Sequence, residues 1–374
     1  MQVNDNVRMK HFGNFIALLI LAINALFTGL LLLVAYSPYI QPVAHPVQSC
    51  FGLTFPIFAL INGAFLIFWL VIQRYKTALL PLIGFLLCYS QLRTYLPLNF
   101  HTANPPEESI KFLSYNIMGF NGAVKKDGKN PILTYLKESN ADILCLQEYA
   151  SDESPRRLTQ KDIERELKDY PYHRISVVGS GSGYTNKIAC YSKFPILSAR
   201  VLNYPSGYNG SVLYELKLNE DTITLINNHL ESNKLTKADK DIYEDILKAP
   251  EKEKVKSGAR LLVHKLAEAS AIRAPQADTI AREIASSRYP SVIVCGDFND
   301  TPISYAHRVI AQNLDDAFTQ SGRGLGISYN QNKSYFRIDN ILISKNLQSY
   351  NCTVDRSIKE SDHYPIWCYI AKRQ

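Results

Sequence analysis

The chain has 374 residues, with 41 Lys and Arg against 34 Asp and Glu and a formal net charge of +7. This length fits one large domain or two small ones. Before residue 107 the charged residues are few: Asp5, Arg8, Lys10, Arg74, Lys76 and Arg93. The remainder is normally charged and close to neutral, which disfavours tight nucleic-acid binding because that requires several phosphate-neutralising cations.

Two apolar runs near the start, residues 15–36 and 51–72, each extend over about 22 residues without a charge, which is long enough to cross a bilayer. A third run, 78–92, reaches that length only by extending past Arg93 to about Leu96, with the arginine side chain at the interface. A buried helical hairpin is the alternative, and the scarcity of charge disfavours it. The first run is too long for a signal peptide. We predict a membrane anchor of two to three transmembrane helices over residues 1–100.

The basic residues around these runs predict their orientation. Arg8 and Lys10 precede the first run, and Arg74 and Lys76 follow the second, whereas the loop 37–50 has no charge. Because basic loops stay in the cytoplasm, three spans would place everything after about Phe100 outside it. With two spans the same part would be cytoplasmic. We predict a multi-pass membrane protein whose soluble domain is extracytoplasmic.

Residues 101–109, with adjacent prolines at 105 and 106, form a predicted linker before a soluble domain over 110–374. Short apolar runs in this domain predict strands, and 132–139, 158–169 and 234–287 predict helices. "KIACYSKFPILSAR" (187–200) is typical of a strand, a turn and a strand. In "VIVCGDFNDTP" (292–302) β-branched residues predict a buried strand that Gly296 is expected to end. This alternation predicts an α/β sandwich with mixed sheets and helices on the outside.

Polar residues recur where these strands end. Any one of them is explained by a turn, since Asp, Asn and Pro are ordinary turn formers, and Asp300 fits that reading best. Several strands that each deliver carboxylates, amides or imidazoles at one end are typical of a binding or catalytic site instead. The candidates are Asn116, Gln147, Glu148, His229, Asp297, Asn299, Asp339, Asp362 and His363.

Six motifs contain these residues, in the order "SYNI", "LQE", "NHL", "GDFN", "RIDNIL" and "SDHYPI". Together they resemble the endonuclease/exonuclease/phosphatase superfamily, in a membrane-anchored form of bacterial type. The resemblance extends from about Ile110 to the C-terminus. It implies a DNase I-like four-layered α/β sandwich, preceded here by the all-α transmembrane region, and hydrolysis of phosphate esters with a divalent metal.

The resemblance implies a metal site. Glu148 matches the family's metal-binding carboxylate, Asn116 lies alongside to hold metal or phosphate, and Asp362 belongs beside the metal and its solvent. Mg²⁺ suits such oxygen ligands, with Mn²⁺ as a substitute. The sequence lacks the thiolate or histidine cluster that zinc prefers.

The resemblance also implies catalytic roles. Asp297 matches the carboxylate that takes the proton of the attacking water, and Asn299 orients water and phosphate. His363 matches the histidine that stabilises charge on the scissile phosphate, and Asp339 the carboxylate that orients that histidine. For Asp339, an ion pair with Arg337 or a strand-end cap is an alternative of equal weight.

His229 matches a histidine that protonates the leaving oxygen in the branch with DNase I, sphingomyelinases and inositol-phosphate phosphatases. DNase I has a carboxylate that orients this histidine. The stretch before "IACYSK" offers Asn186 and Lys187 in its place. Asn186 is thus a substrate-binding candidate, together with Asn116 and Asn299.

The expected protein is a membrane-tethered, metal-dependent phosphodiesterase or phosphatase. Its substrate stays open among nucleic acid, lipid headgroups and soluble phosphate esters, and the anchor favours lipid headgroups. A charged insertion at about 234–265 is a candidate for substrate or membrane contact. The alternative is a catalytically inactive membrane-bound binding module, which the retained motif residues disfavour.

Overall fold

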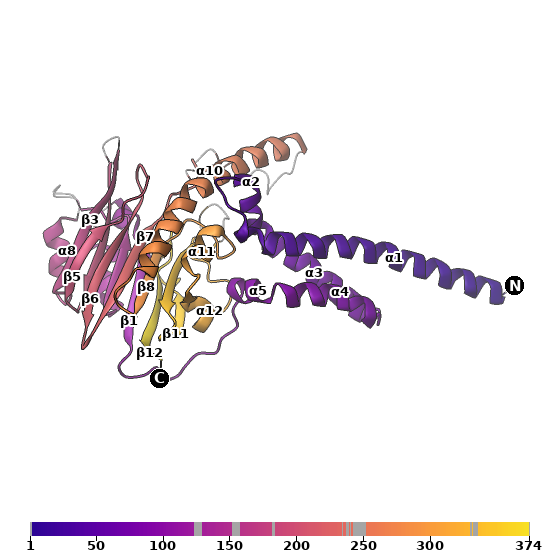
Figure 1. Ribbon diagram of the computed structural model, residues 1–374, viewed down its shortest axis with the longest axis horizontal. Coiled ribbons are helices and arrows are strands. Elements are labelled where there is room, and N and C mark those ends of the chain that lie inside the picture. The colour runs from indigo at the N-terminus through magenta and orange to yellow at the C-terminus, as the bar shows by residue number, and fades with distance from the viewer. Residues whose placement is uncertain are drawn as a thin grey trace.

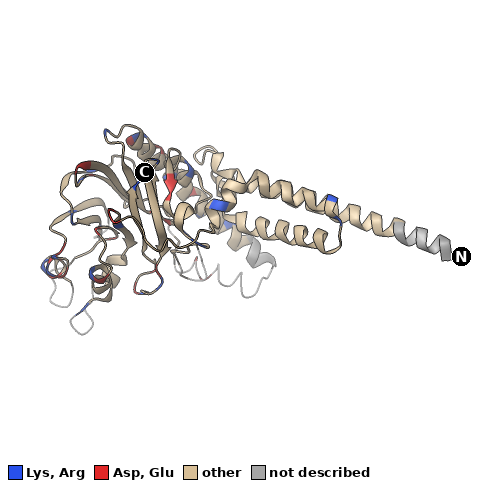
Figure 2. Cartoon of the chain, turned by 90° about the horizontal axis from the view of Figure 1, so that it is seen from below, with Lys and Arg blue, Asp and Glu red and all other residues tan. Residues whose placement is uncertain are grey.

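The computed structural model describes residues 2–122, 129–151, 158–181, 184–233, 235–236, 239, 241, 252–329, 331 and 336–373. A helical extension formed by the first 95 residues projects from an α/β sandwich, and the N-terminus lies at its far end (Figure 1). The extension is almost free of charged residues, whereas Lys, Arg, Asp and Glu gather over the sandwich (Figure 2).

Three helical passes make up the extension. Helix α1 (Gln2–Ala35) runs toward the sandwich, α3 (Phe55–Val71) runs away from it, and α4 (Tyr75–Leu87) returns and continues after a break at Cys88 as α5 (Tyr89–Tyr95) (Figure 1). Short turns join α1 to α3: η1 (Ser37–Tyr39), α2 (Pro46–Ser49) and η2 (Cys50–Thr54). Two segments, His11–Tyr39 and Pro46–Val71, are long and apolar enough to cross a membrane, and Tyr75–Leu87 is shorter.

Two polar side-chain contacts join α1 and α3 inside the helical extension, between the apolar clusters around Leu31 and Trp69. Trp69 Nε1 donates a hydrogen bond to Asn24 Oδ1 at 3.0 Å. Thr28 Oγ1 donates to Asn62 Oδ1 at 2.8 Å. These four side chains are buried, while most of the exposed large side chains of the extension are Leu, Ile and Phe. Polar groups therefore pair between α1 and α3, and apolar side chains both pack inside the extension and cover its outer surface.

The sandwich contains two six-stranded sheets. The first has the order β11-β12-β1-β2-β4-β3, with bounds β1 (Ile110–Asn116), β2 (Ile143–Gln147), β3 (Tyr172–Gly181), β4 (Tyr184–Ser192), β11 (Leu347–Val354) and β12 (Ile366–Lys372). The second has the order β5-β6-β7-β8-β10-β9, with bounds β5 (Ile196–Val201), β6 (Gly210–Leu218), β7 (Asp221–His229), β8 (Val292–Asp297), β9 (Leu314–Asp316) and β10 (Asp339–Ser344).

Helices cover the outer face of each sheet. On the first sheet, α7 (Pro131–Glu138) and α8 (Gln160–Glu166) pack through Leu133 and Ile163. On the second, α10 (Lys252–Ala285) and α11 (Tyr305–Ile310) pack through Ile280 and Ala306. A third core fills the space between the sheets, where Phe112 and Ile293 are buried. Two further short helices are α6 (Met118–Gly122) and α12 (Ala317–Ser321). This order of helices, sheet, sheet and helices confirms the predicted α/β sandwich.

The predicted helices over 132–139 and 158–169 appear as α7 and α8. That over 234–287 appears as α10 from Lys252, and 234, 237–238, 240 and 242–251 lie outside the described residues. The strands of 187–200 form, but β4 and β5 belong to different sheets, so the chain crosses between sheets at the turn before Pro195.

The expectation that Gly296 ends its strand is wrong, since β8 continues to Asp297. Gly296 has φ +119°, and a Cβ there would lie 2.0 Å from the carbonyl oxygen of Asn228 on β7. Glycine therefore permits the close approach of two parallel strands at this point.

The helical extension docks tightly on the sandwich. Ile303, from the loop after β8, is buried among Leu31 of α1 and Phe55 of α3. Arg308 Nε donates to the carbonyl oxygen of Pro38 at 2.8 Å. At Gly52, a Cβ would lie 2.0 Å from the carbonyl oxygen of Ile303. Because nothing larger than a hydrogen fits there, the turn between α1 and α3 lies directly on the backbone of the sandwich.

Gly52→Ala should therefore destabilise the full chain by about 1–3 kcal/mol through overpacking, measured by thermal unfolding in detergent micelles. The matched control is Gly63→Ala, because a Cβ at Gly63 meets nothing within 4 Å and alanine is the better helix former. Equal melting temperatures for the two variants would contradict the tight contact at Gly52.

Candidate functional site

The sheet topology brings the predicted residues to one edge of the sandwich. Strands β1 and β2 run parallel and pair Asn116 with Gln147 at their carboxyl ends. Strands β7 and β8 are also parallel and pair His229 with Asp297. Strand β10 is antiparallel to β8, so its first residue, Asp339, lies opposite Asp297. Carboxyl ends of parallel strands and the amino end of an antiparallel one thus meet at the same place.

The final motif reaches this edge just before β12. Ser361 Oγ donates a hydrogen bond to the backbone oxygen of Asn116 at 2.7 Å, and the backbone N–H of His363 donates to Ser361 Oγ at 3.2 Å. Ser361 thereby fixes the loop that carries Asp362 and His363 onto the end of β1.

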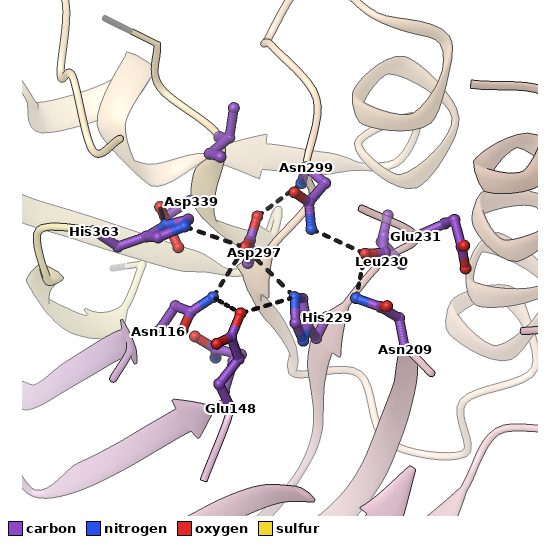
Figure 3. A network of polar contacts seen from close by, with 12 residues as sticks. Asn116, Glu148, Asn209, His229, Leu230, Glu231, Asp297, Asn299, Asp339 and His363 are labelled. Carbon is purple, nitrogen blue, oxygen red and sulfur yellow. Dashed lines mark hydrogen bonds and ion pairs between the residues drawn. The ribbon is translucent and has the colours of Figure 1, made fainter. Parts of the chain in front are cut away.

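The buried carboxylate of Asp297 is the centre of the cluster (Figure 3). Its Oδ2 accepts from Asn116 Nδ2 at 3.1 Å, and its Oδ1 accepts from the backbone N–H of Asn299 at 2.8 Å. The Nε2 atoms of His363 and His229 lie 3.6 and 3.7 Å from Oδ2. Burial raises the pKa of Asp297 to about 6, although His363 lowers it. This carboxylate can accept a proton near neutral pH.

Glu148 stands beside this centre. Its Oε1 accepts from Asn116 Nδ2 at 3.0 Å and lies 3.7 Å from His229 Nε2 (Figure 3). The Glu148 side chain is 37% exposed, in contrast to Asp297. Its backbone has φ +52°, an unfavourable conformation for glutamate that directs the chain as it leaves β2. Asn299 also has a left-handed φ, of +51°.

His363 is held by a buried carboxylate. His363 Nδ1 lies 2.8 Å from Asp339 Oδ2, so this nitrogen carries the hydrogen and Nε2 faces Asp297. Burial alone would lower the pKa of His363, but the carboxylates of Asp339 and Asp297 raise it well above its usual range. The alternative pair of Asp339 with Arg337 does not form, because Arg337 Nη1 binds Asp316 at 3.0 and 3.2 Å.

His229 has an amide where His363 has a carboxylate. Asn186 Nδ2 lies 3.2 Å from His229 Nδ1 and also donates to the backbone oxygen of Tyr208 at 3.1 Å. Since that oxygen only accepts, the amide nitrogen is the donor, and His229 Nδ1 accepts. Burial lowers the pKa of His229. The ring is therefore neutral, with its hydrogen on Nε2.

A cavity of about 530 Å³ opens above these side chains. Glu148, His229, Asp297, Asn299, Asp362 and His363 line one end of it. Asn116 and Asp339 lie behind them as hydrogen-bonding partners, and Asn186 lies behind His229. The structure therefore brings all the predicted site residues together.

Asp300 has a structural role beyond a turn. Its Oδ2 accepts from Arg273 Nε at 3.2 Å, and the two side chains are 11% and 3% exposed. Arg273 Nη1 also donates to the backbone oxygen of Glu231 and to Asn233 Oδ1, both at 2.9 Å. A buried ion pair thus anchors α10 beside the site.

Some residues around the site were not predicted from the sequence. The ring of Tyr329 contacts His363 edge to face, with centroids 5.2 Å apart. Ser328 Oγ accepts from the backbone N–H of Asp339 at 3.1 Å. Both lie in an irregular segment without a motif, so only the fold reveals them. Ser361, one residue before Asp362, could have been found from its place in "SDHYPI".

The acids supply the groups that a hard divalent cation requires. Asp297, Asp339 and His363 each place a potential ligand atom within 4.8 Å of the others, but His363 Nδ1 and Asp339 Oδ2 contact each other at 2.8 Å, so this pair is already engaged within the protein. Glu148 and Asp362 add carboxylates at the cavity. Oxygen ligands of this kind suit Mg²⁺, and the four carboxylates outnumber the two imidazoles. The excess of negative charge favours cation binding at this end of the cavity.

Two family models match the chain. The Endonuclease/Exonuclease/phosphatase family matches residues 113–363, and a domain of unknown function matches residues 17–95. No curated protein matches. The first match spans the strands that carry the site and ends at His363.

Solved structures are similar in fold at low identity. An endonuclease/exonuclease/phosphatase from Beutenbergia cavernae is 13% identical with a TM-score of 0.51, over 71% of this chain and 72% of that chain. TDP2 from D. rerio, complexed with single strand DNA product, is 17% identical with a TM-score of 0.47, over 71% and 99%. The human nocturnin catalytic domain with bound sulfate is 16% identical with a TM-score of 0.48, over 74% and 97%.

The family match covers well over half of the chain. The observed two-sheet sandwich agrees with the fold that the sequence resemblance implied. The chain belongs to the endonuclease/exonuclease/phosphatase family.

Proposed function

We propose that this protein is a membrane-tethered, divalent-metal-dependent hydrolase of phosphate esters with its site outside the cytoplasm. The family's description names nucleases and phosphatases, which hydrolyse phosphate esters. The observation that carries the proposal is the buried Asp297 carboxylate between two imidazoles at one end of a cavity. This arrangement offers a base, a cationic phosphate ligand and a hydrogen-bond donor within one site.

In the proposed reaction a water oxygen attacks phosphorus, and Asp297 accepts a proton from that water. The bond between phosphorus and the leaving oxygen breaks. Asn299, whose backbone N–H holds Asp297 Oδ1, orients the carboxylate. His363, protonated because Asp339 and Asp297 raise its pKa, binds a phosphate oxygen and stabilises the charge that develops there.

His229 acts on the leaving oxygen in this proposal. Its neutral ring presents an N–H at Nε2, so it donates a hydrogen bond and keeps its proton. The leaving oxygen takes its proton from solvent, which balances the one that Asp297 accepted from water. An imidazolium at His229 would direct Nδ1–H against the Asn186 amide, which disfavours proton donation from this ring.

Glu148, Asn116 and Asp362 would hold the metal. Glu148 lines the cavity with an exposed carboxylate, and Asp362 lines it as well. When bound, a divalent ion neutralises phosphate charge and polarises the phosphoryl group. The Asn116 amide, which donates to both Glu148 and Asp297, keeps these two carboxylates apart and oriented.

The membrane part of the proposal is supported by the apolar outer surface of the helical extension and by the pairing of its buried polar groups. Asn24, Thr28 and Asn62 are buried and paired within it, and many large apolar side chains are exposed on its outside. Soluble proteins bury apolar groups, whereas helices in lipid pair their polar groups internally. The basic Arg74 binds Asn14 at the end away from the sandwich, which favours a cytoplasmic location for that end.

Asp297→Asn should lower turnover of bis-p-nitrophenyl phosphate by about 10²–10⁴-fold, because it keeps shape and removes the base. Its melting temperature should stay close to that of the parent protein. Asp300→Asn, three residues on, should lower stability and spare activity. It weakens the buried ion pair with Arg273, which should lower the free energy of unfolding by about 3 kcal/mol, and it should leave turnover per folded molecule nearly intact. Equal losses of turnover in both variants would contradict the base role. A parent protein inactive on every phosphate ester tested would favour the binding module.

Glu148→Gln should weaken activation by Mg²⁺ or Mn²⁺ by about 10-fold or more, because it removes an anionic ligand while keeping the shape of the side chain. The activating metal concentration is measured for both proteins, with Glu215→Gln on strand β6 as the control far from the site. Activity that survives EDTA in the parent protein would rule out metal dependence.

A C-terminal alkaline phosphatase fusion should be active and a C-terminal green fluorescent protein fusion dark. Alkaline phosphatase becomes active only after export, whereas green fluorescent protein matures in the cytoplasm and does not become fluorescent when it is exported through the general secretory route. The expectation follows from three passes that end at the sandwich, with α4 and α5 together about 30 Å long. The opposite pair of results would place the sandwich in the cytoplasm.

A further inference from the structure

The lining of the cavity is of two chemical kinds. Besides the catalytic side chains, it includes a set of apolar residues. The apolar lining includes Leu53, Leu262, Val263, Leu266, Ile303 and Phe336. Among the lining residues that the structure describes, Arg273 is the one Lys or Arg, and it is paired with Asp300. A phosphate at the catalytic end would therefore have a hydrophobic space beside it.

One wall of this space comes from the helical extension. Ser49, Cys50 and Leu53 line the cavity, and they lie in α2 and η2, the short helices at the start of the second long apolar segment, Pro46–Val71. Ser49 Oγ lies 3.3 Å from Ser270 Oγ of α10. Together with the tight contact at Gly52, this fixes the wall against the sandwich. The catalytic cavity is thus completed by residues at the end of the proposed membrane anchor.

The adjoining wall comes from α10, which lies beside α2 (Figure 1). Leu262, Leu266, Ser270 and Arg273 line the cavity at spacings of four, four and three residues, so they share one face of the helix. Two neighbouring side chains on the same helix, Leu261 and Val263, are 39% and 38% exposed. The apolar character therefore continues from the cavity onto the outer surface.

From this geometry we propose that the substrate is an amphiphilic phosphate ester drawn from the bilayer, with its phosphate at Asp297 and His363 and a hydrocarbon chain between Leu53 and the Leu262–Leu266 face of α10. The proposal rests on the proposed hydrolase function and names the substrate class of that same site. A polar soluble ester would bury nothing against these walls, whereas each buried methylene of a lipid chain contributes to binding.

A nucleic acid fits this cavity less well. A strand needs cations along its backbone and flat aromatic surfaces for its bases. The described lining offers one arginine that is already paired, and its apolar members beside the anchor are mostly aliphatic. The position of the wall at the end of the apolar segments gives a lipid direct access from the membrane surface.

The test uses the full chain in lipid nanodiscs and a series of p-nitrophenyl alkyl phosphate diesters with ethyl, octyl and dodecyl chains. Nitrophenolate release gives kcat/KM for each. We expect kcat/KM to rise by about two- to fourfold for each of the first methylenes added, since burial of one methylene corresponds to a factor of about four at most. A value independent of chain length in an enzyme active on the ethyl ester would overturn the lipid proposal and leave the hydrolase function standing.

A matched pair of variants separates binding in the cavity from partition into the bilayer. Leu262→Asn changes a residue that lines the cavity, and Leu261→Asn makes the same change next to it on exposed surface. The first should flatten the dependence of kcat/KM on chain length, and the second should preserve it. Leu53→Asn, on the adjoining wall, should behave like Leu262→Asn. Identical behaviour of the Leu261 and Leu262 variants would attribute the effect to partition and overturn the proposal.

A binding readout keeps the proposal testable without turnover. Dodecyl phosphate should raise the melting temperature of the parent protein and of the Leu261 variant, and ethyl phosphate should not. If no ester is hydrolysed but dodecyl phosphate still stabilises the protein selectively, the hydrolase function fails and the lipid cavity stands. Faster hydrolysis of single-stranded oligothymidylate than of the dodecyl ester would assign the site to nucleic acid and overturn the proposal.

Discussion

The negative charge of Asp297, removed from water between the two sheets, is the constraint on which the rest of the site depends. A buried carboxylate is costly unless its neighbours hydrogen-bond to it or carry positive charge. Those neighbours come from both halves of the sandwich: Asn116 and the cationic His363 from the side of the first sheet, and the backbone of Asn299 from the second. The sheets must therefore pack with the ends of β1 and β8 side by side, and the same packing aligns the catalytic side chains.

The two histidines have different partners at Nδ1, and this difference separates their proposed roles. His363 contacts the carboxylate of Asp339 and is favoured as a cation, whereas His229 contacts the amide of Asn186 and is favoured as a neutral ring. Both rings are buried and both face Asp297. Burial lowers the pKa of both rings, and the carboxylates of Asp339 and Asp297 outweigh it at His363, so the two pKa values shift in opposite directions. Two imidazoles of like charge so close together would repel, and the asymmetry avoids this.

Much of this arrangement could be predicted from sequence, because strands that end in carboxylates, amides or imidazoles leave a local pattern in the chain. The sandwich and the strand-end residues were accessible in this way. The partnership of Asp339 with His363 was only implied by the family resemblance, with an Arg337 ion pair or a strand-end cap as an alternative of equal weight. Long-range choices were not. The crossing between sheets before Pro195 and the pairing of Arg337 with Asp316 depend on which elements become neighbours. The need for glycine at 296 depends on the distance to another strand.

The contact at Gly52 and Ile303 has a consequence for how the protein can be divided. A fragment that begins after the helical extension would expose Ile303 to water and lack Ser49, Cys50 and Leu53. Its catalytic side chains would remain, since all of them come from the sandwich. Such a fragment would retain the chemistry and lose a wall of the cavity, so its preference among substrates would differ from that of the whole chain. The same turns between α1 and α3 thus hold the extension on the sandwich and form a wall of the cavity in which we propose that the substrate binds.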